Sequence, residues 1–117
     1  MTPTYHRALI VGAGSGLSAA LARQLAGDGL RVGLAARDVG KLEGLARETG
    51  AAIQACDASR PAEVEALFAA IEPALGGAPD VVVYNASGRV RGAIADLDPE
   101  AVAQALAVSA FGGFLVA

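Results

Sequence analysis

The stretch Ala8–Ser18, ALIVGAGSGLS, decides the fold of this chain. Four apolar residues run directly into glycines at alternate positions, Gly12, Gly14 and Gly16, and a helical pattern follows. This order predicts a strand, a tight turn and a helix. Such a turn presents backbone N–H groups and the positive end of a helix dipole, while the glycines let a ligand approach the main chain. The stretch therefore predicts a site for the diphosphate of a nucleotide cofactor.

Apolar runs and helical patterns alternate through the rest of the chain. Strands over 31–35, 52–56 and 81–84 are expected to alternate with helices over 15–27, 39–48 and 61–74, and a last helix opens at Asp98-Pro99. We expect Asp38, Ser59 and Asp98 to cap the second, third and last helices. Parallel strands joined by helices require right-handed crossovers. The chain is therefore predicted to be an α/β protein, a doubly wound parallel sheet in three layers.

Composition narrows the functional classes. Hydrophobic residues make up 54% of the 117 residues and charged residues 18%, which excludes a disordered chain. The net charge is −3 with scattered basic residues, so we expect neither a nucleic-acid face nor a polybasic membrane patch. A single cysteine, Cys56, and an N-terminus without a long apolar region favour a cytoplasmic protein. No Cys, His, Asp and Glu residues have metal-ligand spacing, so no metal is expected.

The stretch 101–117 is apolar on more than one face. It is shorter than the roughly 20 strongly apolar residues of a membrane span and contains Gln104, so we expect a buried helix. Leaving one large apolar side chain exposed forgoes about 1.5–3 kcal/mol. A helix of this kind therefore needs cover on nearly all sides. We expect the chain to be the front part of a longer sheet, or a partner chain to cover the helix.

An arginine follows the second predicted strand, in the segment Leu34-Ala35-Ala36-Arg37-Asp38. About 20 residues after the glycines, an NAD site places a carboxylate on the ribose hydroxyls. A guanidinium at this place suits a 2′-phosphate instead. Asp38 could be the ribose acid, although its position favours a helix cap, and Arg37 could merely be a solvated loop residue. The segment favours NADP over NAD.

Polar residues also follow the third and fourth predicted strands. The carboxylate of Asp57 could accept from an adenine amino group, or it could initiate the next helix; both remain open. After the fourth strand, the small and polar run 85–88 would let the backbone approach a ligand. The Asn85 amide could brace neighbouring loops there, and a plain turn is the alternative.

These features, in this order, resemble the short-chain dehydrogenase/reductase family over the whole chain. The resemblance implies a Rossmann-type NAD(P)-binding domain and hydride transfer between a nicotinamide and an alcohol or carbonyl substrate. The family's T-G-x-x-x-G-x-G has Val11 and Ser18 here in place of the threonine and the last glycine. Its N-N-A-G reads Tyr84-Asn85-Ala86-Ser87.

The resemblance also implies a role for individual residues. Ser109 stands where the family's V-N-x-x-G-x-F motif has the asparagine of its catalytic tetrad. The Ser109 hydroxyl could hold the water that this asparagine holds in the family, although the serine side chain is shorter. No Tyr-x-x-x-Lys occurs in the chain. By the resemblance, the pyrophosphate is held by Gly12, Ser15, Gly16 and Leu17, the 2′-phosphate by Arg37, the adenine by Asp57, and the region near the ribose and nicotinamide by Asn85 and Ala86.

We therefore expect residues 1–117 to be the N-terminal, NADP-binding portion of a short-chain reductase, truncated after the helix that follows the fourth strand. Alone it should be inactive. The intact protein is expected to be a homo-oligomer acting on a small carbonyl or alcohol. One alternative is a non-enzymatic NAD(P)-binding or sensing module that dimerises through its last helix. Another is a decayed gene product that does not fold stably.

Overall fold

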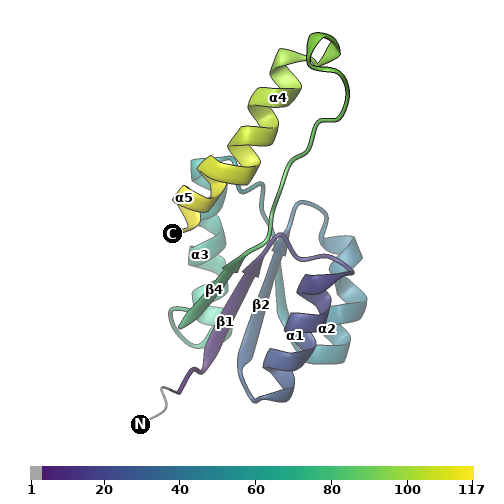
Figure 1. Ribbon diagram of the computed structural model, residues 1–117. Coiled ribbons are helices and arrows are strands. Elements are labelled where there is room, and N and C mark those ends of the chain that lie inside the picture. The colour runs from purple at the N-terminus through teal and green to yellow at the C-terminus, as the bar shows by residue number, and fades with distance from the viewer. Residues whose placement is uncertain (1–3) are drawn as a thin grey trace.

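The computed structural model describes residues 4–117, which form a parallel four-stranded sheet flanked by helices (Figure 1). The strands lie in the order β3-β2-β1-β4. They are β1 (Arg7–Val11), β2 (Arg31–Ala36), β3 (Ala52–Ala55) and β4 (Val81–Tyr84). The helical segments are α1 (Leu17–Gly27), η1 (Val39–Leu42), α2 (Glu43–Thr49), α3 (Pro61–Leu75), η2 (Ile94–Asp96), α4 (Pro99–Leu106), η3 (Ala107–Phe111) and α5 (Gly112–Val116).

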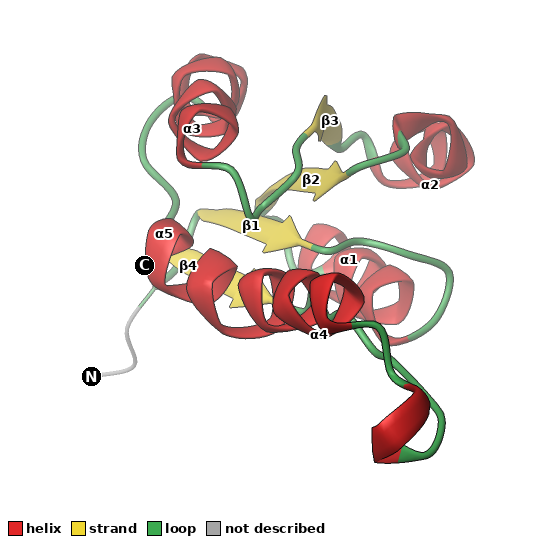
Figure 2. Ribbon diagram, turned by 90° about the horizontal axis from the view of Figure 1, so that it is seen from above, coloured by secondary structure: helices red, strands yellow, loops and turns green. Residues whose placement is uncertain are grey.

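The central strand β1 is covered on both faces, as its unbroken apolar sequence predicts. Leu9 and Val11 pack with residues of α3, whereas Ile10 packs with residues of α1 and α2 on the other face. Figure 2 shows α1 and α2 on one side of the sheet and α3 on the other. The predicted three-layer, doubly wound α/β fold is confirmed.

The strand register brings the carboxyl ends of the strands to one edge. Val11 at the end of β1 pairs with Ala35 of β2 and with Tyr84 of β4. The chain moves outward from β1 to β3 and then returns to place β4 on the other side of β1. In open α/β sheets, such a reversal of strand order opens a crevice beyond the strand ends. The loops after β1, β2, β3 and β4 all lead into this region.

Two local expectations about the helices are wrong. Helix α1 begins at Leu17 and not at residue 15, and Leu17 is 74% exposed, while Ala19 and Ala22 face the sheet. Ser59 does not cap α3: Arg60 takes the N-cap position without a side-chain bond. The Ser59 hydroxyl donates to Asp57 Oδ1 at 2.7 Å instead, since that carboxylate lies within reach inside the same turn.

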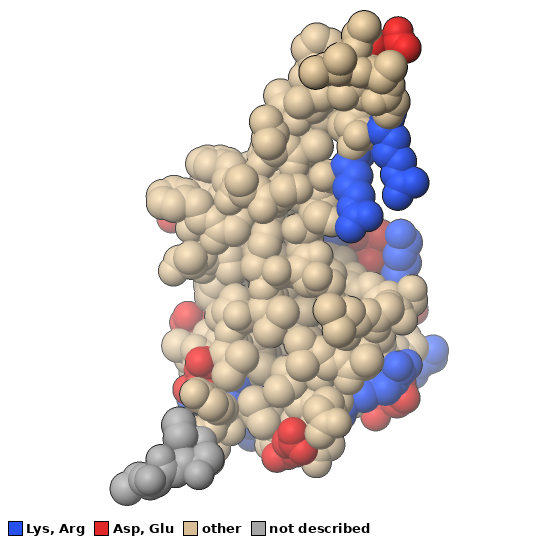
Figure 3. Space-filling model, viewed as in Figure 1, with Lys and Arg blue, Asp and Glu red and all other residues tan. Residues whose placement is uncertain are grey.

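The last helical rod, α4–η3–α5, extends beyond the sheet (Figure 1). Asp98 caps it as predicted, accepting from the Glu100 N–H at 3.2 Å. The expectation of a buried helix is wrong within this chain, because Phe114 is 73% exposed and Leu106 63%. By length and composition alone, Pro99–Val116 could cross a membrane. Figure 3 shows the viewed face of this rod largely without charged side chains.

A π-helical turn, η3, interrupts the rod where it passes β4. The Gly112 N–H donates to the Ala107 carbonyl, five residues back. The Tyr84 hydroxyl donates to the carbonyl of Val108, a residue within this turn. A side chain at 112 would collide with this hydroxyl, so the glycine permits the close approach. The wider turn therefore lies where the rod contacts β4.

Candidate functional site

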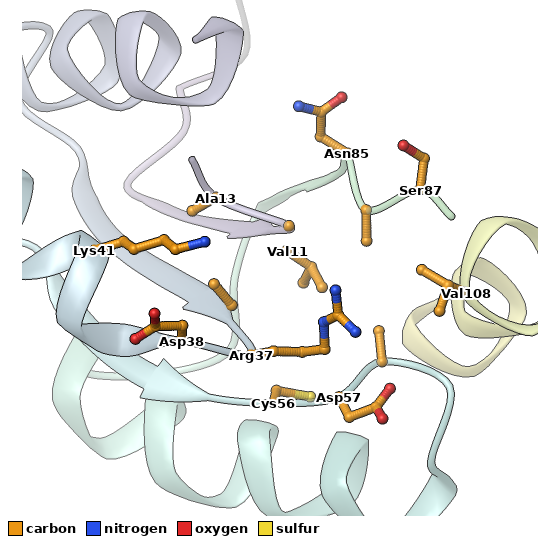
Figure 4. A pocket seen from close by; sticks show the side chains of 14 residues that line it. Val11, Ala13, Arg37, Asp38, Lys41, Cys56, Asp57, Asn85, Ser87 and Val108 are labelled. Atoms are coloured by element: carbon orange, nitrogen blue, oxygen red, sulfur yellow. The ribbon is translucent and has the colours of Figure 1, made fainter. Parts of the chain in front are cut away.

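The loops that follow the four strands line one cleft of about 490 Å³, a size typical of sites for small organic ligands (Figure 4). It lies where the register brings the strand ends together. The lining residues are Val11, Gly12, Ala13, Ala36, Arg37, Asp38, Lys41, Cys56, Asp57, Ala58, Asn85, Ala86, Ser87 and Val108.

The glycine turn is held against both strands that neighbour β1. The N–H groups of Gly12 and Ala13 donate to the Ala35 carbonyl at 2.9 and 3.0 Å. Gly12 has φ +87°, and a Cβ there would lie 2.5 Å from the Ala86 Cα. Because these two N–H groups already bind β2, the donors for a ligand are those that follow, up to the start of α1. That helix has no side-chain cap and no acidic residue in its first turn.

A buried hydroxyl joins the glycine turn to the loop after β4. The Asn85 amide donates to Ser18 Oγ at 2.8 Å, and Ser18 Oγ lies 3.4 Å from the Gly12 carbonyl that it donates to. Ser18 is only 2% exposed. The predicted bracing role of Asn85 is therefore confirmed. The partner was missed, because the sequence showed Ser18 only as a substitution for a glycine.

The segment after β2 supplies the positive charge of the cleft. Arg37 and Lys41 both line it, and both are exposed. Asp38 caps η1 as predicted, accepting from the Gly40 N–H at 3.0 Å. Lys41 was not singled out from the sequence. A second basic residue four positions after Arg37, within η1, is a signal that could have drawn attention to it, but the spacing does not fix the direction of the side chain.

The turn after β3 contributes an ionised carboxylate. The Ser59 hydroxyl and N–H both donate to Asp57 Oδ1, at 2.7 and 3.0 Å. These hydrogen bonds, chiefly that of the hydroxyl, lower the pKa of Asp57, and the nearby charge of Arg37 acts in the same direction. The carboxylate is therefore charged at neutral pH.

Cys56, beside it, is a core residue. It is 3% exposed, and its thiol donates to the Glu63 carbonyl at 3.6 Å. Burial, together with the negative charges of Glu63 and Asp57, raises the pKa of the thiol to about 11. A thiol that stays protonated is a poor nucleophile, so Cys56 contributes to the wall of the cleft and not to its chemistry.

Several predicted site residues lie outside the cleft lining. Ser15, Gly16 and Leu17 are exposed beside it, at the entrance to α1. Ser109 Oγ accepts from the Gly88 N–H at 3.0 Å and donates to the Gly88 carbonyl at 3.2 Å. Its hydroxyl therefore links η3 to the loop after β4. In residues 4–117, no three His, Cys, Asp or Glu side chains gather in a way that could hold a metal ion.

Comparisons with known proteins bear on this arrangement. The sequence model of the family described as short chain dehydrogenase matches residues 6–117. An uncharacterised oxidoreductase of Caenorhabditis elegans is 38% identical over 100 residues, which cover 80% of this chain and 32% of that protein.

Solved structures match nearly the whole chain. An actinorhodin polyketide ketoreductase variant with NADPH is 36% identical with a TM-score of 0.88, covering 96% of this chain and 44% of its own. A metagenomic short-chain oxidoreductase in complex with NADP is 34% identical with a TM-score of 0.86, and the match covers 95% of this chain and 52% of that protein's chain. An NADH-dependent reductase complexed with NAD is 28% identical with a TM-score of 0.80, and the match covers 96% of this chain and 49% of that protein's chain. The chain thus spans about a third of the curated relative and about half of these structures.

Proposed function

The chain belongs to the short-chain dehydrogenase family, and from this premise we propose that it is the NADP-binding portion, residues 1–117, of an oxidoreductase. When bound, the nicotinamide would accept or donate a hydride. The intact protein would use it to interconvert a small-molecule carbonyl and the corresponding alcohol. The observation that carries the proposal is the presence of Arg37 in the same cleft as the glycine turn and Asp57.

The residues of the cleft fit a dinucleotide. The backbone of the turn leaves no room for a side chain at Gly12, and α1 begins without a side-chain cap. The positive end of that helix favours a pyrophosphate. We assign this group to the turn, with Ser15, Gly16 and Leu17 as its donors.

The adenosine end would lie between the loops that follow β2 and β3. Both hydrogen bonds from Ser59 to the Asp57 carboxylate go to Oδ1, so we assign Oδ2 to the adenine amino group. Arg37 would bind the 2′-phosphate, because a guanidinium offers two parallel donors to phosphate oxygens. Asn85 and Ala86, on the β4 side, would lie near the ribose and the nicotinamide.

The choice of NADP over NAD rests on the charges after β2. An NAD site needs a carboxylate for the ribose hydroxyls. Asp38 is the carboxylate next to Arg37, and its Oδ1 already caps η1. Asp38 therefore already has a structural role, whereas the Arg37 side chain is exposed in the cleft and makes no salt bridge within residues 4–117. A 2′-phosphate is therefore the better partner for this segment.

A fluorescence titration with NADPH and NADH tests the assignment. The unaltered chain should bind NADPH more tightly than NADH. Arg37→Asp should cost NADPH about 1.5–3 kcal/mol, roughly a ten- to hundredfold loss of affinity, and should spare NADH. Arg47→Asp, on an exposed site outside the cleft lining, is the matched control. Equal affinities of the unaltered chain for the two cofactors would contradict NADP preference.

Catalysis requires residues beyond those of the cleft. Ser109 is the proposed counterpart of a tetrad residue, although its hydroxyl binds Gly88. The chain has no Tyr-x-x-x-Lys to protonate a carbonyl oxygen. We therefore propose that residues 1–117 alone do not turn over substrate. NADPH oxidation with a panel of aldehydes and ketones should stay at background, and robust turnover would overturn this part of the proposal.

A second candidate function is favoured by the rod α4–η3–α5. Phe111 and Phe114 are exposed and stack on each other with ring centroids 6.2 Å apart. Exposed apolar surface of this kind is a common dimer contact. A non-enzymatic cofactor-binding module could pair through it, and the intact oxidoreductase could use the same face as a homo-oligomer. A discrete, stable dimer of residues 1–117 in sedimentation would favour the module.

A further inference from the structure

We propose that Lys41 is a second cation for the cofactor's 2′-phosphate and that it contributes, with Arg37, to the choice of NADP over NAD. This inference rests on the proposed function. Neither the sequence pattern nor the family resemblance singled out this lysine. It is the structure that places it in the cleft.

The two cations reach the cleft from different elements. Arg37 follows the last residue of β2, whereas Lys41 lies in η1. Figure 4 shows the Lys41 side chain extending from η1 into the same cleft as Arg37. Among residues 4–117, the salt bridges join Arg23 to Glu48 and Arg60 to Glu63, so neither Arg37 nor Lys41 is engaged in one.

The backbone of η1 holds Lys41 at this place. Asp38 caps the segment through the Gly40 N–H at 3.0 Å. Leu42, the next residue, is 1% exposed and packs into the core on the α1 and α2 side of the sheet. With its neighbours fixed on both sides, Lys41 has a fixed Cα, and only its flexible side chain needs to adjust to a ligand.

Charge complementarity explains why a second cation would matter. A phosphate monoester carries about −1.5 to −2 charges at pH 7, which one guanidinium does not neutralise. Arginine supplies directional, paired hydrogen bonds, whereas lysine acts as a mobile point charge. Arg37 would therefore set the position of the phosphate, and Lys41 would add electrostatic attraction. This attraction should depend on ionic strength, because the Arg37 and Lys41 side chains are both exposed.

The test is a titration of NADPH and NADH against matched variants. Lys41→Ala should weaken NADPH about five- to tenfold and leave NADH unchanged, and Lys41→Arg should restore most of the loss. The preference for NADPH should also depend less steeply on salt in Lys41→Ala. Arg47→Ala, in the neighbouring helix and outside the cleft lining, controls for general loss of charge.

The outcomes of this titration distinguish a failure of the role of Lys41 from a failure of the proposed NADP preference. If the unaltered chain prefers NADPH and Arg37→Ala abolishes the preference while Lys41→Ala matches the unaltered chain, the role of Lys41 is wrong and the proposed function stands. An equal loss for NADPH and NADH in Lys41→Ala also overturns it, because the lysine would then act on the shared part of the cofactor. If the unaltered chain shows no preference for NADPH, the proposed NADP preference fails and the role of Lys41 fails with it.

Discussion

Replacing Gly12 by alanine should destabilise the protein strongly, because two separate costs fall on one residue. Its φ of +87° is a conformation that costs a residue with a side chain about 1–2 kcal/mol. The added Cβ would also lie 2.5 Å from the Cα of Ala86 and 2.7 Å from the carbonyl carbon of Asn85. Both are backbone atoms, which cannot rotate away.

The expected magnitude follows from these two terms. Forcing a methyl group into a packed site costs about 1–3 kcal/mol, which with the backbone term gives roughly 2–5 kcal/mol in all. The total stability of a domain is about 5–15 kcal/mol. At about 4 °C per kcal/mol for a chain of this size, the melting temperature should fall by about 8–20 °C.

Gly14→Ala is the matched control for this experiment. It lies in the same turn, but no atom lies within 4 Å of a Cβ built there. Thermal unfolding followed by circular dichroism should therefore place Gly14→Ala within about 3 °C of the unaltered chain. If Gly12→Ala melts at the same temperature as Gly14→Ala, the turn does not adopt the described contact with the β4 loop, and the reasoning is refuted.

Three further predictions use the same cleft. Gly16→Ala should leave the melting temperature nearly unchanged, since no atom lies within 4 Å of a Cβ built there. It should weaken the binding of NADPH and NADH alike, because the pyrophosphate is assigned to this turn. Unchanged affinities in a titration would place the pyrophosphate elsewhere. Ser18→Ala should destabilise the chain by about 1–2 kcal/mol in urea unfolding, because the Asn85 amide loses its 2.8 Å acceptor, and the exposed Ser15→Ala is the control; similar stabilities for the two variants would argue against the bridge. In the folded state the pKa of the Cys56 thiol is about 11, against 9.0 when unfolded. The contribution of the protonated thiol to stability is therefore complete below pH 9 and is lost as the pH rises toward 11. Cys56→Ala should show a smaller loss of stability over this range, and an identical loss would assign the effect to other groups.

Much of the fold follows from local patterns in the sequence. Unbroken apolar runs identify strands that are buried on both faces, and β1 is such a strand. Asp38 and Asp98 were predicted as caps and act as caps, because a cap bond joins residues only two positions apart. The cap at Ser59 was wrong for a related reason. The Asp57 carboxylate is also only two positions away, and it accepts from the hydroxyl and the N–H of Ser59, so the side chain expected to cap the helix is engaged elsewhere.

The cleft itself was predicted in part. Gly12, Arg37, Asp57 and Asn85 follow different strands, and parallel strands end at one edge, so their convergence follows from the order of the elements along the chain. Lys41 could not be placed in this way, because the direction of its side chain depends on how η1 leaves β2. Its role in binding remains a prediction.

The sequence alone determined the alternation of strands and helices, since apolar spacing and turn residues act over a few positions. The tertiary structure alone decided the contacts between distant elements. Ser18 and Asn85 are 67 positions apart, and Tyr84 meets Val108 across 24. Such pairs depend on strand register and on the path of the helices, which are set by packing of the whole core and leave no local pattern to read.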